Sequence, residues 1–132
     1  MAHNPQNLNE EMNVFLQDRH LASLTLLRAD GGLHVTPVGF TWDAATATAR
    51  VITWSGAQKI RLLEASGGGR AALCQVDGGR WVTLEGHAVA TADPQACADA
   101  VDRYTKRYNP PKDRGVDRRV IVIAVDRVLG RA

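Results

Sequence analysis

The segment at residues 52–61 combines residue types that suit the binding of an anion. The segment begins at the end of a predicted strand rich in β-branched residues, continues through small polar residues such as Ser55, and enters a predicted helix near Gln58. The first turn of a helix presents free backbone N–H groups and the positive end of the helix dipole, which stabilise a nearby anion by about 0.3–1 kcal/mol. Lys59 and Arg61 add full charges at the same place. The pattern predicts a phosphate site, and the alternative is a surface helix with solvated cations.

A second concentration of charge lies at residues 103–119, where seven basic residues accompany two aspartates and the local net charge is +5. The whole chain carries a net charge of +2, so the excess is confined to this segment. We expect it to meet something anionic, and the alternative is an ordinary solvated surface. Few aromatic residues are interleaved with these charges, so we do not expect a nucleic-acid partner.

Two tryptophans, Trp54 and Trp81, stand at the ends of predicted strands beside loops. An indole in such a place can lie against a flat ring while its nitrogen finds a hydrogen-bond partner, although packing in the core is the commoner role. His34 and His87 also fall in predicted strands, where we interpret them as hydrogen-bonding residues rather than catalysts.

Several common kinds of active site have no sequence signature here. The chain lacks a phosphate-binding loop, a dinucleotide fingerprint and a nucleophile elbow, and Glu85, the only glutamate within the predicted strands, has no partner nearby in sequence for paired-carboxylate chemistry. The four histidines and the two cysteines, Cys74 and Cys97, show no metal-ligand spacing, and we expect no metal and two reduced thiols. These absences argue against hydrolases and nucleotide-binding enzymes, and no residue is assigned a catalytic role.

The elements that must position these residues follow from hydrophobic periodicity and turn residues. Asp-Gly-Gly at residues 30–32 and 77–79 predicts two tight hairpins. Pro37 cannot donate to a ladder, so it predicts an edge, a bulge or a barrel corner. Helices are predicted at residues 8–18, at residues 58–65 and from the Asp93 cap to Asn109, and strands at residues 20–29, 33–42, 50–54, 70–76, 80–91 and 119–128.

This order predicts a mainly β protein with small helices, a six-stranded antiparallel barrel that is closed or split. The last strand is apolar on both faces, which indicates a central position or cover by a partner subunit. We expect one domain over residues 1–132, with an N-terminal helix within residues 1–18 and a basic loop at residues 109–118 before the last strand. A signal peptide and a membrane span are not evident, so we expect a cytoplasmic protein without a membrane partner.

Four segments carry a family resemblance: HLASLTLLRADGGLHVTPVGF, ARVITWSGAQKIR, ALCQVDGGRWVTLEGHA and RRVIVIAVDRVLG. They resemble the flavin and deazaflavin oxidoreductase superfamily with the split barrel of the pyridoxamine-phosphate-oxidase type, over roughly residues 15–130. The motifs QVDGGRWVTLEG, RYNPP and DRVLG are especially similar to the deazaflavin-dependent biliverdin reductases.

The resemblance implies a homodimer of FMN-binding split-barrel type that holds coenzyme F420 in a groove between its subunits. It places His34, Thr36 and Val38 along the deazaflavin ring, Thr53 and Ser55 against the ring or side chain, Gln58, Lys59 and Arg61 on the phosphate, and Trp81 over the groove from the neighbouring subunit. Many relatives have asparagine where this chain has Leu62, and Arg61 is a possible substitute. The phosphate-binding pattern of the FMN oxidases is not evident, so FMN is the alternative cofactor.

The resemblance implies hydride transfer from the reduced deazaflavin to a conjugated substrate, with biliverdin, which becomes bilirubin, as the first choice. The basic segment, with Arg107, Arg114 and Arg118, would then meet the propionates of the tetrapyrrole or the acidic tail of the coenzyme. The alternatives are F420-dependent reduction of a quinone or other unsaturated compound, and a barrel that carries flavin, deazaflavin or haem without catalysis.

Overall fold

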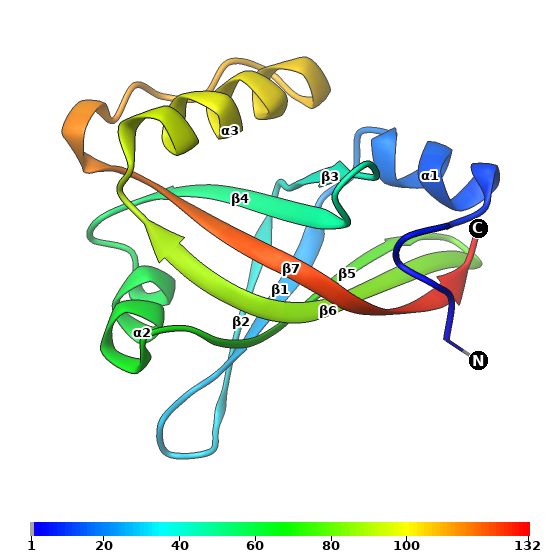
Figure 1. Ribbon diagram of the computed structural model, residues 1–132, viewed down its shortest axis with the longest axis horizontal. Coiled ribbons are helices and arrows are strands. Elements are labelled where there is room, and N and C mark those ends of the chain that lie inside the picture. The colour runs from blue at the N-terminus through cyan, green and yellow to red at the C-terminus, as the bar shows by residue number, and fades with distance from the viewer. Residues whose placement is uncertain (1) are drawn as a thin grey trace.

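The computed structural model describes residues 2–132, and within them the chain forms three α-helices and seven strands (Figure 1). In chain order they are α1 (Glu10–Gln17), β1 (Ala22–Leu27), β2 (Leu33–Val38), β3 (Thr41–Asp43), β4 (Thr48–Trp54), α2 (Gln58–Ser66), β5 (Gly69–Asp77), β6 (Arg80–Thr91), α3 (Pro94–Arg107), a 3-10 turn (Gly115–Asp117) and β7 (Arg118–Arg131). Within the described residues no helix is long and apolar enough to cross a membrane.

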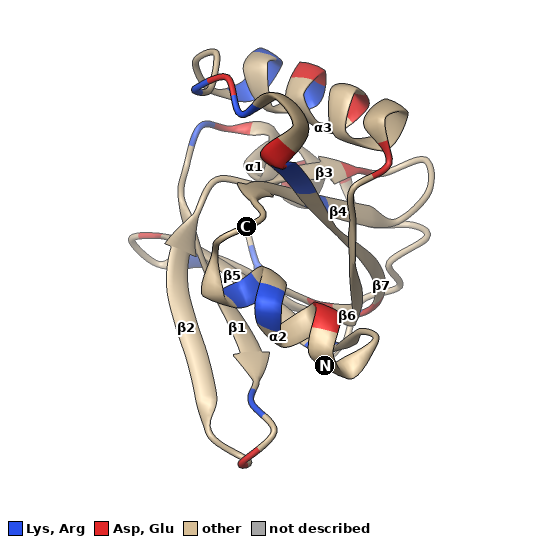
Figure 2. Ribbon diagram, turned by 90° about the vertical axis from the view of Figure 1, so that its left-hand side faces the viewer, with Lys and Arg blue, Asp and Glu red and all other residues tan. Residues whose placement is uncertain are grey.

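All seven strands join one antiparallel sheet in the order β2-β1-β5-β6-β7-β4-β3. The sheet curls around the core, and Figure 2 shows its strands on all sides of that core. The two edge strands, β2 and β3, are neighbours in the chain. β3 pairs with β4 only at residues 48–50, so the rest of β4 has one unpaired edge, as does β2. The barrel is therefore split beside these two strands, as predicted.

The strand predicted at residues 33–42 is wrong as a single element, because the chain bends after Val38 and forms β2 and β3. Gly39 packs so closely against α3 that a Cβ atom there would lie 2.9 Å from Cε2 of Tyr104. Phe40 turns into the core and is 1% exposed. The sheet therefore has seven strands instead of the predicted six. Pro37 lies on an edge strand, as expected.

Both predicted hairpins are confirmed. Gly31 at the first turn has a φ of +85°, and Oδ1 of Asp30 accepts a 2.8 Å hydrogen bond from the N–H of Gly32. Gly78 has a φ of +60° at the second turn. Because a positive φ favours glycine, the Asp-Gly-Gly sequences were sufficient to predict both tight turns.

Both terminal helices start at side-chain caps. Asn9 accepts from the N–H of Met12 at 2.8 Å, and Asp93 accepts from the N–H of Ala96 at 2.9 Å. α1 closes one end of the barrel with Met12, Phe15 and Leu16, which are all buried. α3 lies across the outside of the sheet, over β3, β4 and β7 (Figure 1).

The last strand has the central place that its apolar faces predicted, between β6 and β4. Ile121, Ile123 and Val125 point into the barrel core. On the other face Val120 is buried under α3, whereas Ala124 is exposed. α3 therefore covers the start of this outer face and leaves its middle open.

Candidate functional site

A cavity of about 320 Å³ lies where the barrel is split. Its walls come from the end of β2, the end of β4, the first turn of α2, α3 and the loop before β7. The lining residues are Pro37, Val38, Gly39, Ile52, Thr53, Trp54, Lys59, Tyr104, Pro111, Lys112, Arg114 and Arg118. Four of them are cationic, so the two basic segments that the sequence shows far apart meet in one place.

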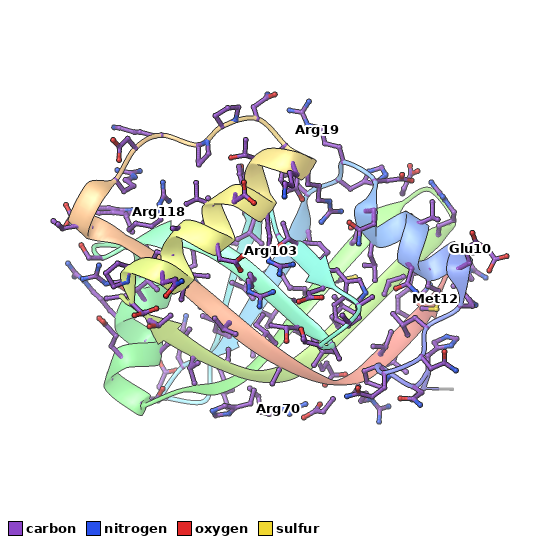
Figure 3. The ribbon with its side chains drawn as sticks, turned by 45° about the horizontal axis from the view of Figure 1, so that its top comes forward. Glu10, Met12, Arg19, Arg70, Arg103 and Arg118 are labelled. Carbon is purple, nitrogen blue, oxygen red and sulfur yellow. The ribbon has the colours of Figure 1, made fainter. Side chains whose placement is uncertain are left out.

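The pairing of β4 with β7 brings these segments together. Trp54 and Arg118 are partners in the ladder, although 64 positions separate them in the chain. Nη1 of Arg118 donates to the carbonyl oxygen of Thr53 at 3.1 Å, and Nη2 donates to the carbonyl oxygen of Lys112. Figure 3 shows Arg118 beside the loop that precedes β7. Arg118 therefore fastens this loop to the end of β4.

Arg114 reaches the cavity from the same loop and stacks on Trp54, with its guanidinium carbon 5.1 Å from the ring centroid. The indole also packs on Gly56, where a Cβ atom would lie 2.3 Å from the ring. No side-chain hydrogen bond or ion pair of Arg114 is present within residues 2–132. Burial, with Arg114 nearby, lowers the pKa of Arg118 below its ordinary value. Two like charges held this close favour an anion beside them.

Lys59 points into the same cavity from the first turn of α2 and is half-buried. Burial lowers the pKa of Lys59 below its ordinary 10.5, and no charged neighbour within residues 2–132 shifts it in either direction. The cap residue of α2, Ala57, makes no side-chain hydrogen bond, and the first turn has no acidic residue. A half-buried ammonium without a counter-charge, beside free N–H groups, is suited to a phosphate or a carboxylate.

β2 offers polar groups without partners. His34, Thr36 and Val38 alternate along the strand on the face opposite the exposed Val35, and Val38 lines the cavity. Nδ1 of His34 and Oγ1 of Thr36 are buried and have no hydrogen-bond partner within the described residues. Buried polar atoms normally have a partner, so these two have the chemistry to contact a ligand. They fit the polar edge of a flat heterocycle.

Three other predicted contacts sit near the cavity without lining it. The N–H of Ser55 donates to the carbonyl oxygen of Asp117 at 2.8 Å, and its hydroxyl donates to Oδ1 of Asp117 at 3.2 Å. Ser55 therefore ties β4 to the 3-10 turn. Gln58 and Arg61 lie exposed on α2, whose basic residues appear in blue in Figure 2.

Trp81 lies at the far end of β6, paired with Val76 and Arg131. The opposite end of β6, at Thr91, is the end that neighbours Val120 and the start of β7. A single chain therefore does not bring Trp81 to the cavity.

Arg107 is built into the fold instead of facing the cavity. It donates to the carbonyl oxygen of Asp18 from Nε at 2.9 Å and to that of Phe40 from Nη1 at 2.5 Å. Its Nη2 donates to Oε1 of the fully buried Gln75 at 2.7 Å. Burial lowers the pKa of Arg107, which nevertheless stays charged at neutral pH. Arg107 joins α3 to the barrel, and we do not assign it to substrate binding.

Tyr108 follows Arg107 in the RYNPP motif and acts in the same way. Its hydroxyl donates to the carbonyl oxygen of His20 at 2.6 Å and accepts from the N–H of Phe40 at 3.2 Å. Among the lining residues that were not predicted as site residues, Tyr104 and Lys112 carry polar groups. Lys112 stood within the basic loop, whereas Tyr104 looked like an ordinary member of the apolar face of α3. Within residues 2–132 no three His, Cys, Asp or Glu side chains are grouped to hold a metal.

The fold and the cavity define a split-barrel protein with a cationic cavity at its open edge. The sequence model of the pyridoxamine 5'-phosphate oxidase family matches residues 8–132, and the chain belongs to this family. It is 46% identical, over all of its length, to the F420H2-dependent biliverdin reductase of Mycobacterium tuberculosis (strain CDC 1551 / Oshkosh), of which it covers 94%.

Solved structures show the same fold at low sequence identity. A conserved hypothetical protein of Mycobacterium tuberculosis has a TM-score of 0.77 and 20% identity, with 99% of this chain and 89% of that chain covered. A protein described as an F420 reductase has a TM-score of 0.70 and 24% identity, with 92% of this chain and 98% of that chain covered. Both likenesses concern the fold alone.

Proposed function

We propose that this protein is a coenzyme F420-dependent reductase that converts biliverdin to bilirubin. The observation that carries the proposal is the 46% identity, over the full length of the given sequence, to an F420H2-dependent biliverdin reductase. The cationic cavity at the split agrees with it, because coenzyme F420 carries a phosphate and a tail of carboxylates. Reduced coenzyme F420, when bound, supplies a hydride.

Lys59 is the residue best suited to hold the acidic arm of the coenzyme. It brings an unpaired, half-buried charge to the start of α2, and Gln58 and Arg61 stand in the same turn. His34 and Thr36 offer unpartnered polar atoms to the ring, and Val38 offers an apolar surface. Thr53 is buried at the end of β4 and Ser55 follows the strand, so both are held rigidly nearby.

Arg114 is the residue best suited to bind a propionate of biliverdin, and Arg118 adds a positive charge beside it. Guanidinium groups bind carboxylates with two donors in a fixed geometry. The reduction adds one hydride to the central methine carbon and one proton to a pyrrole nitrogen. The chain's contribution is to hold two flat molecules against each other at the split and to keep water from the reacting atoms.

The outer face of β1, β2 and β5 supports a homodimer. Leu21, Val35 and Val76 are 62%, 55% and 58% exposed, and they lie together on this face with Leu27 and Leu33. Contiguous exposed apolar surface of this kind marks a protein interface. Trp81 is the ladder partner of Val76 and therefore shares this face. In a two-fold dimer the partner subunit's Trp81 can then border the groove that this chain cannot close by itself.

Turnover tests the proposal. The purified protein is mixed with reduced coenzyme F420 and biliverdin, and the absorption bands of the coenzyme, biliverdin and bilirubin are followed together. We expect bilirubin to form in step with oxidation of the coenzyme. A rate equal to the enzyme-free control contradicts the proposal. Tight binding of the coenzyme with no turnover of biliverdin would indicate a carrier, and turnover of a quinone alone would indicate another reductase.

A further inference from the structure

A second cavity, of about 640 Å³, adjoins the first. It lies between α3 and the segment after it, which runs back alongside the helix to the start of β7 (Figure 1). The two cavities share Pro111, Lys112, Arg114 and Arg118 as a common wall. A ligand in one cavity and a ligand in the other would therefore meet the same cations.

The second cavity is mostly apolar. α3 contributes Pro94, Cys97, Ala98 and Val101, which share one helical face. The loop contributes Val116, which is 93% exposed although it is a large aliphatic residue. Exposure of so large an apolar side chain to water is unfavourable, and a ligand that enters the cavity could cover it. Most drug-sized ligands occupy apolar cavities of roughly 300–1,000 Å³ with a few polar groups.

The positive charges of this cavity, on Lys112, Arg114 and Arg118, lie on the wall that it shares with the first cavity. Arg118 already donates to the carbonyl oxygens of Thr53 and Lys112, so its donors are largely occupied. The side chain of Arg114 stacks on Trp54 and makes no hydrogen bond or ion pair within residues 2–132, so its N–H donors are free to bind a carboxylate. Asp113 is the acidic residue of the lining, and its Oδ1 accepts from the N–H of Gly115 at 2.9 Å. The cavity therefore suits an apolar body that carries a carboxylate at one side.

We infer that this cavity is the substrate subsite, which receives an outer pyrrole ring of the linear tetrapyrrole while Arg114 binds a propionate. The inference rests on the proposed function. The cavity at the split presents Lys59 to the acidic arm of the coenzyme, and the larger apolar cavity beside it is left for a second ligand. Lys59 holds the acidic arm of the coenzyme in the smaller cavity, and the apolar cavity receives only an outer ring of the substrate, so the central methine carbon can still contact the deazaflavin. The division predicts that substrate and coenzyme affinity respond to different substitutions.

The variant Ala98→Trp tests this inference by filling the cavity. Ala98 is exposed and loses no core contact, so the variant is expected to fold, and its thermal unfolding curve checks this. The matched control is Gln95→Trp, an exposed position on the same helix outside the cavity. We expect Ala98→Trp to raise the Kd of biliverdin for the coenzyme-free protein, and its KM, about tenfold. The Kd of coenzyme F420 stays within about twofold of wild type in both variants.

The outcomes separate this inference from the proposed function. If wild type reduces biliverdin and Ala98→Trp binds it as wild type does, the subsite is wrong and the function stands. If wild type does not reduce biliverdin, the function is wrong, and equilibrium binding of biliverdin to the two variants still decides the subsite. Equal weakening by both tryptophans, loss of coenzyme affinity in Ala98→Trp, or no binding of biliverdin by wild type would each overturn the inference.

Discussion

Nη2 of Arg107 donates a 2.7 Å hydrogen bond to Oε1 of Gln75, which links the last turn of α3 to the buried interior of β5. The amide nitrogen of Gln75 donates in turn to the carbonyl oxygen of Phe15 at 2.7 Å. One chain of hydrogen bonds therefore connects α3, the barrel and α1. Because α3 also forms a wall of both cavities, this link positions the site without touching a ligand.

Arg107→Met is expected to destabilise the protein by about 2–4 kcal/mol, because it leaves the part-buried carbonyl oxygen of Phe40 and Oε1 of the buried Gln75 without a donor. Unfolding in urea measures the change. The control is Arg28→Met, whose exposed guanidinium lies in a surface hairpin and should change stability by less than about 0.5 kcal/mol. Equal stability of the two variants would contradict the structural role of Arg107.

Lys59→Ala is expected to weaken coenzyme F420 binding about tenfold or more, because a charge-assisted contact to the acidic arm is lost. Fluorescence titration with the coenzyme measures the Kd. Lys106→Ala is the matched control, because Lys106 is an exposed lysine that pairs with Asp102 at 3.1 Å outside the cavity at the split. If Lys59→Ala titrates as wild type does, the assignment of Lys59 is wrong.

Coenzyme affinity should begin to fall at a lower alkaline pH than it would if Lys59 had the ordinary pKa of a lysine. Burial lowers the pKa of Lys59 below 10.5, so the free protein loses this charge at a lower pH. A bound anion favours the charged form, so affinity is full below this lowered pKa and decreases as the pH rises through it. In Lys59→Arg the guanidinium stays charged, and its Kd should remain flat over the same range. Parallel pH profiles for the two proteins would contradict this reading.

Val35→Asp is expected to convert a dimer to a monomer, because it places a charge in the apolar face of β1, β2 and β5. Val14→Asp is the control, since Val14 is 54% exposed on α1, away from that face. Sedimentation velocity gives the mass of each protein in solution. A wild-type monomer, or a dimer that persists in Val35→Asp, would contradict this interface.

The parts of the fold that depend on local chemistry were predictable from the sequence. Gly31 and Gly78 have positive φ at hairpin turns, and Asn9 and Asp93 cap helices with their own side chains. Each of these features involves residues a few positions apart. Pro37 gave a local sign of a corner near the break between β2 and β3, but the close approach of Tyr104 to Gly39 was not predictable, because the chain order does not reveal it.

The candidate site was predictable only in part, for the same reason. Lys59 stood out because the start of α2 carries its own signal. Its meeting with Arg114 and Arg118 depends on the register of β4 against β7, a long-range property. Arg107 looked like a ligand-binding cation, because its acceptors lie 32 to 89 positions away in the chain and no local pattern shows them.

The fate of the transferred hydrogen tests the central claim most directly. Reduced coenzyme F420 with deuterium in place of both hydrogens on the carbon that gives up the hydride is incubated with the protein and biliverdin, and the product is examined by mass spectrometry and NMR. The account predicts bilirubin with one deuterium on its central bridge carbon. Unlabelled bilirubin, or no bilirubin above the enzyme-free control, would contradict it.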